Sequence, residues 1–110
     1  MTGVRFLADS KGLCGFEISG HSSSDCDDEV GKIVCSAVSS AAYMTANTVT
    51  DVIGDSAECR VDEAKMYFFA SGSSETSRAV IKGLKLHLEA LSDQYGDNIR
   101  IFGGVKYVKD

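Results

Sequence analysis

The sequence predicts an α/β chain of the α+β type, folded as a two-layer sandwich. Two pairs of short runs alternate polar and apolar residues, and each pair is joined by turn-forming residues. Two longer segments instead repeat apolar residues every three or four positions, as amphipathic helices do. The resulting order, β-β-α-β-β-α-β, predicts one mixed, mostly antiparallel sheet with two helices on one face. At 110 residues the chain is expected to build a single core, so we predict one domain over residues 1–110.

The first element is expected to be a β-hairpin. Residues 4–8 and 13–19 read as its strands, and residues 9–12 (Asp-Ser-Lys-Gly) supply the turn. Val4, Phe6 and Ala8 are expected to share one face of the first strand. In the second strand, Cys14, Phe16 and Ile18 share one face, and Leu13, Gly15 and Glu17 share the other. Gly20 and His21 then follow where the second strand ends.

A polar stretch and a long helix come next. Residues 22–29 (SSSDCDDE) are too polar for a core element and predict a surface loop. The helix begins at Asp28, or near Lys32 if Gly31 interrupts it, and runs to about residue 52. Its expected buried stripe is Ile33, Val34, Ala37, Val38, Ala41, Met44, Thr48, Val49 and Val52. Cys35 would lie on the flank of this stripe, where a side chain can face a cleft.

The second half repeats the pattern. Gly54-Asp55 ends the first helix, and residues 57–62 and 65–70 read as a second hairpin that turns at Glu63-Ala64. Ser73 or Ser74 is the expected cap of the second helix. Its predicted stripe is Val80, Ile81, Leu84, Leu88 and Leu91.

Residues 99–108 read as a last strand with an interruption at Gly103-Gly104, which a bulge would explain. The sheet face without helices would need covering, and homodimerisation is one way to cover it. The aromatic residues expected to supply apolar contacts there are Tyr67, Phe69, Phe102 and Tyr107.

Composition narrows the function classes. The net charge of −5 disfavours a general nucleic-acid binder, which would carry a basic face, so we expect no direct nucleic-acid contact. No apolar run approaches the roughly 20 residues that span a bilayer, so we expect no membrane association. The first residues do not read as a signal peptide, and a cytoplasmic location follows by default. In that compartment, cysteines 14, 26, 35 and 59 favour free thiols, a metal site or a catalytic cysteine over disulfides.

Cys35 and His21 form the sharpest catalytic hypothesis. A cysteine nucleophile needs a base within hydrogen-bond reach, and a histidine just after a strand can supply it. If Cys35 lies in the first turn, the helix dipole would favour its thiolate by a few tenths to about 1 kcal/mol, and backbone N–H groups there could form an oxyanion hole. On the spacing alone, a buried thiol beside a loop histidine is the simpler interpretation, since free cysteines are often buried.

A zinc site is the rival interpretation. Cys14, His21, Cys26 and Cys35 could in principle provide three sulfur ligands and one nitrogen ligand. Zinc sites usually contain cysteines separated by two to four residues, and this spacing is missing here. We therefore expect no metal. His87, between Leu86 and Leu88, is read as a helix-surface histidine.

The segment GHSSSDCDDEVGKIVCSAVSSAAYMTANTV resembles the signature of the bacterial ribosomal-processing cysteine proteases. That family's pattern is Gly-His, a short loop, then a helix that starts with Asp-Ile-Val-Cys-Ala and continues with small residues and Val-Ser. The matching residues are Gly20-His21, Ile33-Val34-Cys35 and Ala37-Val38-Ser39. Three features depart from the pattern. The loop from His21 to Cys35 is about two residues longer than is usual in the family, Lys32 replaces an aspartate, and Ser36 replaces an alanine. The element order and the length also fit, so the resemblance covers the chain.

The resemblance implies a cytoplasmic, homodimeric thiol protease without a cofactor. By carry-over, His21 is the proton acceptor and Cys35 the nucleophile. The implied substrate is the precursor of a large-subunit ribosomal protein, protein twenty-seven, whose N-terminal extension is removed by a cut after a Phe-Phe pair. The alternative is a non-catalytic, ribosome-associated protein-binding module on the same fold.

Overall fold

A computed structural model of the chain describes residues 1–20, 29–63, 65–102 and 106–107. The elements are β1 (Thr2–Asp9), β2 (Gly12–Ser19), α1 (Glu29–Asn47), η2 (Thr48–Ile53), β3 (Glu58–Val61), β4 (Lys65–Phe69), α2 (Glu75–Gln94), β5 (Ile99–Ile101) and β6 (Lys106–Tyr107).

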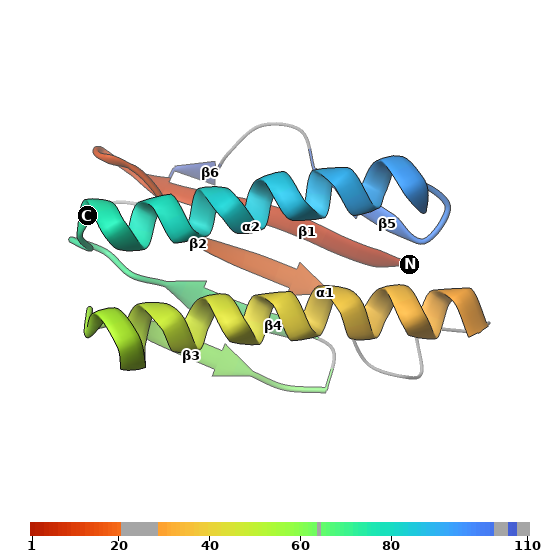
Figure 1. Ribbon diagram of the computed structural model, residues 1–110, viewed down its shortest axis with the longest axis horizontal. Coiled ribbons are helices and arrows are strands. Elements are labelled where there is room, and N and C mark those ends of the chain that lie inside the picture. The colour runs from red at the N-terminus through yellow and green to blue at the C-terminus, as the bar shows by residue number, and fades with distance from the viewer. Residues whose placement is uncertain (21–28, 64, 103–105, 108–110) are drawn as a thin grey trace.

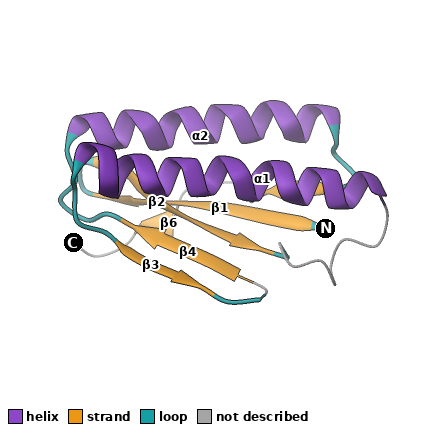
Figure 2. Cartoon of the chain, turned by 60° about the horizontal axis from the view of Figure 1, so that its bottom comes forward, coloured by secondary structure: helices purple, strands orange, loops and turns teal. Residues whose placement is uncertain are grey.

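The strands form one sheet covered by helices on one face, which confirms the predicted fold class. The strand order is β3-β4-β2-β1-β5, and β6 also pairs with β1. The pairs β1–β2, β2–β4 and β3–β4 are antiparallel, whereas β5 and β6 run parallel to β1. Figures 1 and 2 show α1 and α2 side by side in one layer, with the strands in the other.

The first hairpin closes as its turn residues predict. Asp9 pairs with Gly12, which takes a φ of 126°. The Lys11 N–H donates to the Asp9 carboxylate at 2.9 Å, a local bond that stabilises the turn. The pairing shifts between Leu7 and Ala8, which lets Asp9 turn toward α2 at the end of the strand.

The core lies between the sheet and the helices. The rings of Phe16 and Phe68 stack across β2 and β4 with centroids 5.3 Å apart. On α2, the predicted Ile81, Leu84 and Leu88 are buried, and Val80 and Leu91 pack against them half-buried. The buried side chains of α1 close the core from the same side: Val34, Val38, Ala42, Ala46 and, in η2, Val49.

The predicted stripe of α1 is wrong on one side. Ile33 and Met44 are 65% and 68% exposed, and Val52 in η2 is 79% exposed. The observed buried face is rotated and is made of Gly31, Val34, Cys35, Val38, Ala42, Thr45 and Ala46. Apolar residues cover a wider arc of this helix than the core can contact. Their spacing is therefore compatible with either of two neighbouring helix faces being buried.

The first helix ends near the predicted place but changes pitch. η2 is a π-helix of six residues, and Gly54 follows it with a φ of 91°. The N–H groups of Gly54 and Asp55 both donate to the Val49 carbonyl at 3.0 Å, which terminates the helix.

The second helix begins at the predicted cap. Ser74 accepts a hydrogen bond from the Ser77 N–H at 3.2 Å. The Asp55 carboxylate accepts from the Ser74 N–H at 2.9 Å and from the hydroxyls of Ser74 and Ser77 at 2.7 and 2.6 Å. This carboxylate therefore joins the end of η2 to the start of α2.

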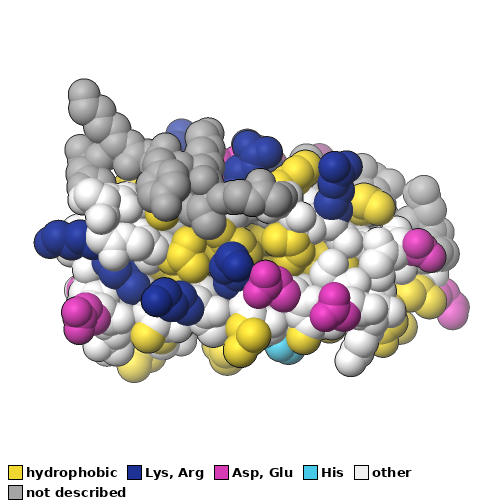
Figure 3. Space-filling model, turned by 90° about the horizontal axis from the view of Figure 1, so that it is seen from above, with side chains coloured by type: hydrophobic (Ala, Val, Ile, Leu, Met, Phe, Trp, Pro, Cys, Tyr) yellow, Lys and Arg dark blue, Asp and Glu magenta, His cyan; other side chains and the backbone are white. Residues whose placement is uncertain are grey.

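The predicted last strand is divided into β5 and β6, both alongside β1. Thr2–Val4 pairs with β5, and Leu7–Ala8 pairs with β6. The bulge expected at Gly103-Gly104 lies outside the described residues. Figure 3, which views the edge where α2, β5 and β6 lie, shows hydrophobic side chains among charged ones.

The sheet face without helices carries stacked arginine and aromatic side chains. Tyr67 and Phe69 in β4 and Phe102, directly after β5, are half-buried on it, as predicted. The side chain of Tyr107, the fourth predicted aromatic residue, lies outside the described part of the chain. The guanidinium of Arg60 lies 4.7 Å from the centroid of Tyr67, and that of Arg5 lies 4.9 Å from the centroid of Phe102. These cation–π contacts cover part of the aromatic surface.

Candidate active site

Cys35 lies on the buried face of α1, against the end of β2. Its side chain is only 6% exposed, and its Sγ lies 4.0 Å from the Gly20 carbonyl oxygen, to which the thiol donates. Two residues of the sequence motif, 15 positions apart, are thereby brought together. His21 follows Gly20 directly but lies outside the described residues, so the described part of the chain does not test the Cys35–His21 pair.

Gly20 is the residue that ends β2 beside the thiol. It takes a φ of 72°, a conformation that other residues rarely adopt. A Cβ at this position would collide with the backbone carbonyl of Met1. The neighbouring pairing of Ser19 with Gly3 holds β2 and β1 together at this end. Glycine is therefore required here both by conformation and by space.

The helix dipole would favour the Cys35 thiolate only if α1 began near Lys32, and this alternative is wrong. α1 begins at Glu29 without an interruption at Gly31, which is buried within it. Cys35 follows Glu29 by six positions, so the helix start is about 9 Å away along the axis. The dipole effect acts mainly in the first turn, and the N–H groups of that turn are too distant to form an oxyanion hole at Cys35.

The other described cysteines lie in contrasting surroundings. Cys14 is fully buried in β2, and burial raises the pKa of its thiol to about 11. Cys59 is exposed on the edge strand β3. Of the residues weighed for a zinc site, His21 and Cys26 lie outside the described residues. Within the described ranges, no group of three or more His, Cys, Asp or Glu residues could hold a metal ion.

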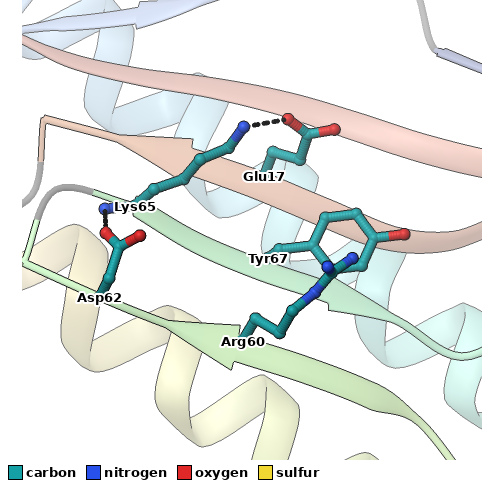
Figure 4. A pocket seen from close by; sticks show the side chains of 5 residues that line it. All are labelled: Glu17, Arg60, Asp62, Lys65 and Tyr67. Carbon is teal, nitrogen blue, oxygen red and sulfur yellow. Dashed lines mark hydrogen bonds and ion pairs between the residues drawn. The ribbon is translucent and has the colours of Figure 1, made fainter.

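A cavity of about 350 Å³ opens on the helix-free face of the sheet, and sequence reasoning did not predict it. Figure 4 shows its lining residues, which are Glu17, Arg60, Asp62, Lys65 and Tyr67. The Lys65 ammonium group pairs with the Glu17 carboxylate at 3.2 Å, and the backbone N–H of Lys65 donates to the Asp62 carboxylate at 2.8 Å. Cys35 does not line it. The only sequence signal was the polar residues alternating along β2, β3 and β4.

The described site and fold define an α+β chain with a shielded cysteine held against a strand end. The family model for the cysteine protease Prp matches residues 1–100. The chain therefore belongs to this family, and its class of activity is that of a cysteine protease. No curated protein sequence matches it significantly.

Solved structures share the fold. The chain is similar to SMU.848 from Streptococcus mutans, with a TM-score of 0.81 at 18% identity, covering 100% of this chain and 99% of that one. It is also similar to the essential ribosomal processing protease Prp from S. aureus in complex with a substrate peptide, with a TM-score of 0.83 at 15% identity, covering 98% of this chain and 100% of that one.

A second structure of the S. aureus protease contains a covalently linked product peptide. Its TM-score is 0.76 at 16% identity, and the match covers 98% of this chain and 100% of that one.

Among the described residues, no helix is long and apolar enough to span a membrane.

Proposed function

We propose that Cys35 is the nucleophile and His21 the proton acceptor of a protease that processes a ribosomal protein. The substrate is the precursor of large-subunit protein twenty-seven, whose N-terminal extension is cut after a Phe-Phe pair. The observation that carries the proposal is the position of the Cys35 Sγ, 4.0 Å from the carbonyl of the residue that precedes His21. Family membership and the peptide complexes of the S. aureus protease support it.

The reaction follows from the two side chains. His21 takes the Cys35 thiol proton, and the thiolate attacks the carbonyl carbon of the second phenylalanine. The C–N bond breaks, the new amino terminus leaves with the proton from His21, and a thioester to Cys35 remains. Water then attacks the thioester while His21 takes its proton, which releases the extension as an acid and returns the thiol. No cofactor takes part.

The proposal includes a cytoplasmic homodimer that contacts neither nucleic acid nor membrane. The net charge of −5 supports a basic peptide as the partner rather than a polyanion. The half-buried Tyr67, Phe69 and Phe102 on the helix-free sheet face support a second copy there, because a partner would complete their burial.

Mass spectrometry of a peptide with a Phe-Phe-Ala sequence tests the activity. The wild-type protein is expected to cut after the second phenylalanine, and Cys35→Ala and His21→Ala are each expected to lose cleavage while keeping the fold. Cys59→Ala is the matched control, because it removes an exposed thiol and should leave cleavage unchanged. Undiminished cleavage by Cys35→Ala would refute the assignment, and peptide binding without cleavage by the wild type would favour the binding-module alternative.

A further inference from the structure

Contacts with neighbouring strands restrict the backbone at the end of β2. Gly20 adopts a φ of 72°, and on the side where a Cβ would point it faces the Met1 carbonyl. Met1 precedes β1, whose first residue, Thr2, donates its N–H to the Asn98 carbonyl at 2.9 Å. Thr2 is only 1% exposed and also pairs with Ile99. The backbone beside Gly20 is therefore held by three strands, β2, β1 and β5.

This constraint acts directly on the thiol. The Gly20 carbonyl accepts from the Cys35 thiol, and the α1 residues on either side of Cys35 on the buried face, Val34 and Val38, are 1% and 0% exposed. Because this face of α1 is packed into the core, Cys35 is held beside the Gly20 carbonyl, and this contact helps to orient the thiol.

We propose that Gly20 is a positioning residue for Cys35, with its backbone, fitted against the Met1 carbonyl, orienting the thiol for attack. This inference rests on the proposed function only in treating Cys35 as the nucleophile. A side chain at position 20 displaces the end of β2 and moves the Gly20 carbonyl away from the Cys35 thiol. A misplacement of about 1 Å in a catalytic group is enough to cost about a hundredfold in rate.

The chain contains a matched control for this glycine. Gly72 has a φ of 71°, almost equal to that of Gly20, but a Cβ at Gly72 would meet nothing within 4 Å. Gly72 lies between β4 and α2, and Gly20 follows β2. Because β2 and β4 are antiparallel, with Gly15 opposite Phe69 and Ser19 opposite Lys65, the two glycines follow opposite ends of this strand pair. Asparagine tolerates this left-handed conformation better than other residues do, so Gly20→Asn and Gly72→Asn carry similar backbone strain. Only the first meets the Met1 carbonyl.

Two readouts separate positioning from general destabilisation. Relative to Gly72→Asn, Gly20→Asn is expected to lower kcat for the Phe-Phe-Ala peptide about a hundredfold, with KM changed less than about threefold. Alkylation of Cys35 by iodoacetamide, followed by peptide mass mapping, is expected to become at least about threefold faster, because a thiol now 6% exposed is no longer held against the Gly20 carbonyl. Equal effects of both substitutions, or parallel falls in kcat and alkylation rate, would overturn the proposal.

The alkylation experiment tests the role of Gly20 even if the protein cleaves no peptide. If the wild type cleaves no peptide, the proposed function fails, but faster alkylation in Gly20→Asn alone still establishes that Gly20 positions the thiol. If Gly20→Asn does not fold, Gly20→Ser with its smaller side chain is compared with Gly72→Ser in the same two assays. Unchanged Cys35 alkylation in the Gly20 variant then overturns the inference.

Discussion

Arg78 on α2 binds the Asp9 carboxylate at the end of β1 through two hydrogen bonds, from Nη1 to Oδ1 at 2.6 Å and from Nη2 to Oδ2 at 2.8 Å. The two residues are 69 positions apart and are 7% and 3% exposed. Arg78 also donates to the Gly12 carbonyl at 3.0 Å and the Ser73 carbonyl at 3.2 Å. This ion pair fastens the first hairpin to the start of α2.

Removing one partner is expected to be costly. Arg78→Ala leaves a buried carboxylate without its counter-ion and should lower the free energy of unfolding by about 3–5 kcal/mol. The control is Lys85→Ala, which breaks the exposed Lys85–Glu89 pair on the same helix and should cost less than about 1 kcal/mol. Urea unfolding at pH 7 measures both. Similar losses for the two variants would contradict a structural role for the buried pair.

The same pair predicts an acid dependence. The hydrogen bonds from Arg78 hold the pKa of Asp9 well below its ordinary value. A carboxylate with a lowered pKa contributes stability above its unfolded pKa of about 4, and this contribution is lost as the pH falls toward the folded pKa. The stability difference between wild type and Asp9→Asn should therefore be constant from pH 7 to about 5 and shrink below about 4. A pH-independent difference in urea titrations would count against this account.

The buried face of α1 can be tested by a pair of neighbouring substitutions. Val34 is 1% exposed and Ile33 is 65% exposed. Val34→Ala opens a space in the core and should cost about 2 kcal/mol, whereas Ile33→Ala should change stability by less than about 0.5 kcal/mol. Thermal and urea unfolding distinguish them. A larger loss of stability for Ile33→Ala than for Val34→Ala would indicate that the buried face predicted from the apolar spacing is correct.

The cap of α2 predicts a measurable coupling. Ser74→Ala removes the side-chain acceptor of the Ser77 N–H and should cost about 1 kcal/mol. Its cost should be smaller in an Asp55→Ala background, because the Ser74 hydroxyl also donates to Asp55. Ser40→Ala, at an exposed position within α1, is the control and should be neutral. A double-mutant cycle by urea unfolding measures the coupling, and additive losses would exclude it.

Thiol reactivity should follow burial. Burial raises the pKa of Cys14 to about 11, so very little of this thiol is ionised at pH 8. Cys59 is exposed, and we expect iodoacetamide to modify it at least about a hundredfold faster than Cys14 in the folded protein. Peptide mapping over time measures the two rates, with denatured protein as the control in which they converge. Comparable rates in the folded protein would show that Cys14 is accessible.

Local chemistry explains what was predictable from the sequence. Asp9 and Gly12 specify a turn, Ser74 specifies a helix start and Gly54 a helix end, because each effect acts within a few residues. The family motif likewise singles out Gly20, His21 and Cys35, because the residues that carry it lie close together along the chain. The role of His21 stays a prediction, since it lies outside the described residues.

The sequence by itself determined the order of the elements, their approximate ends and the family signature, because turn chemistry and apolar periodicity are local. Only the tertiary structure decided which face of α1 is buried, since Ile33 and Val34 fit the same periodicity equally well. It also decided that the Cys35 thiol meets the Gly20 carbonyl and that Arg78 meets Asp9. Such contacts depend on how the layers pack, and no pattern within a few residues encodes that.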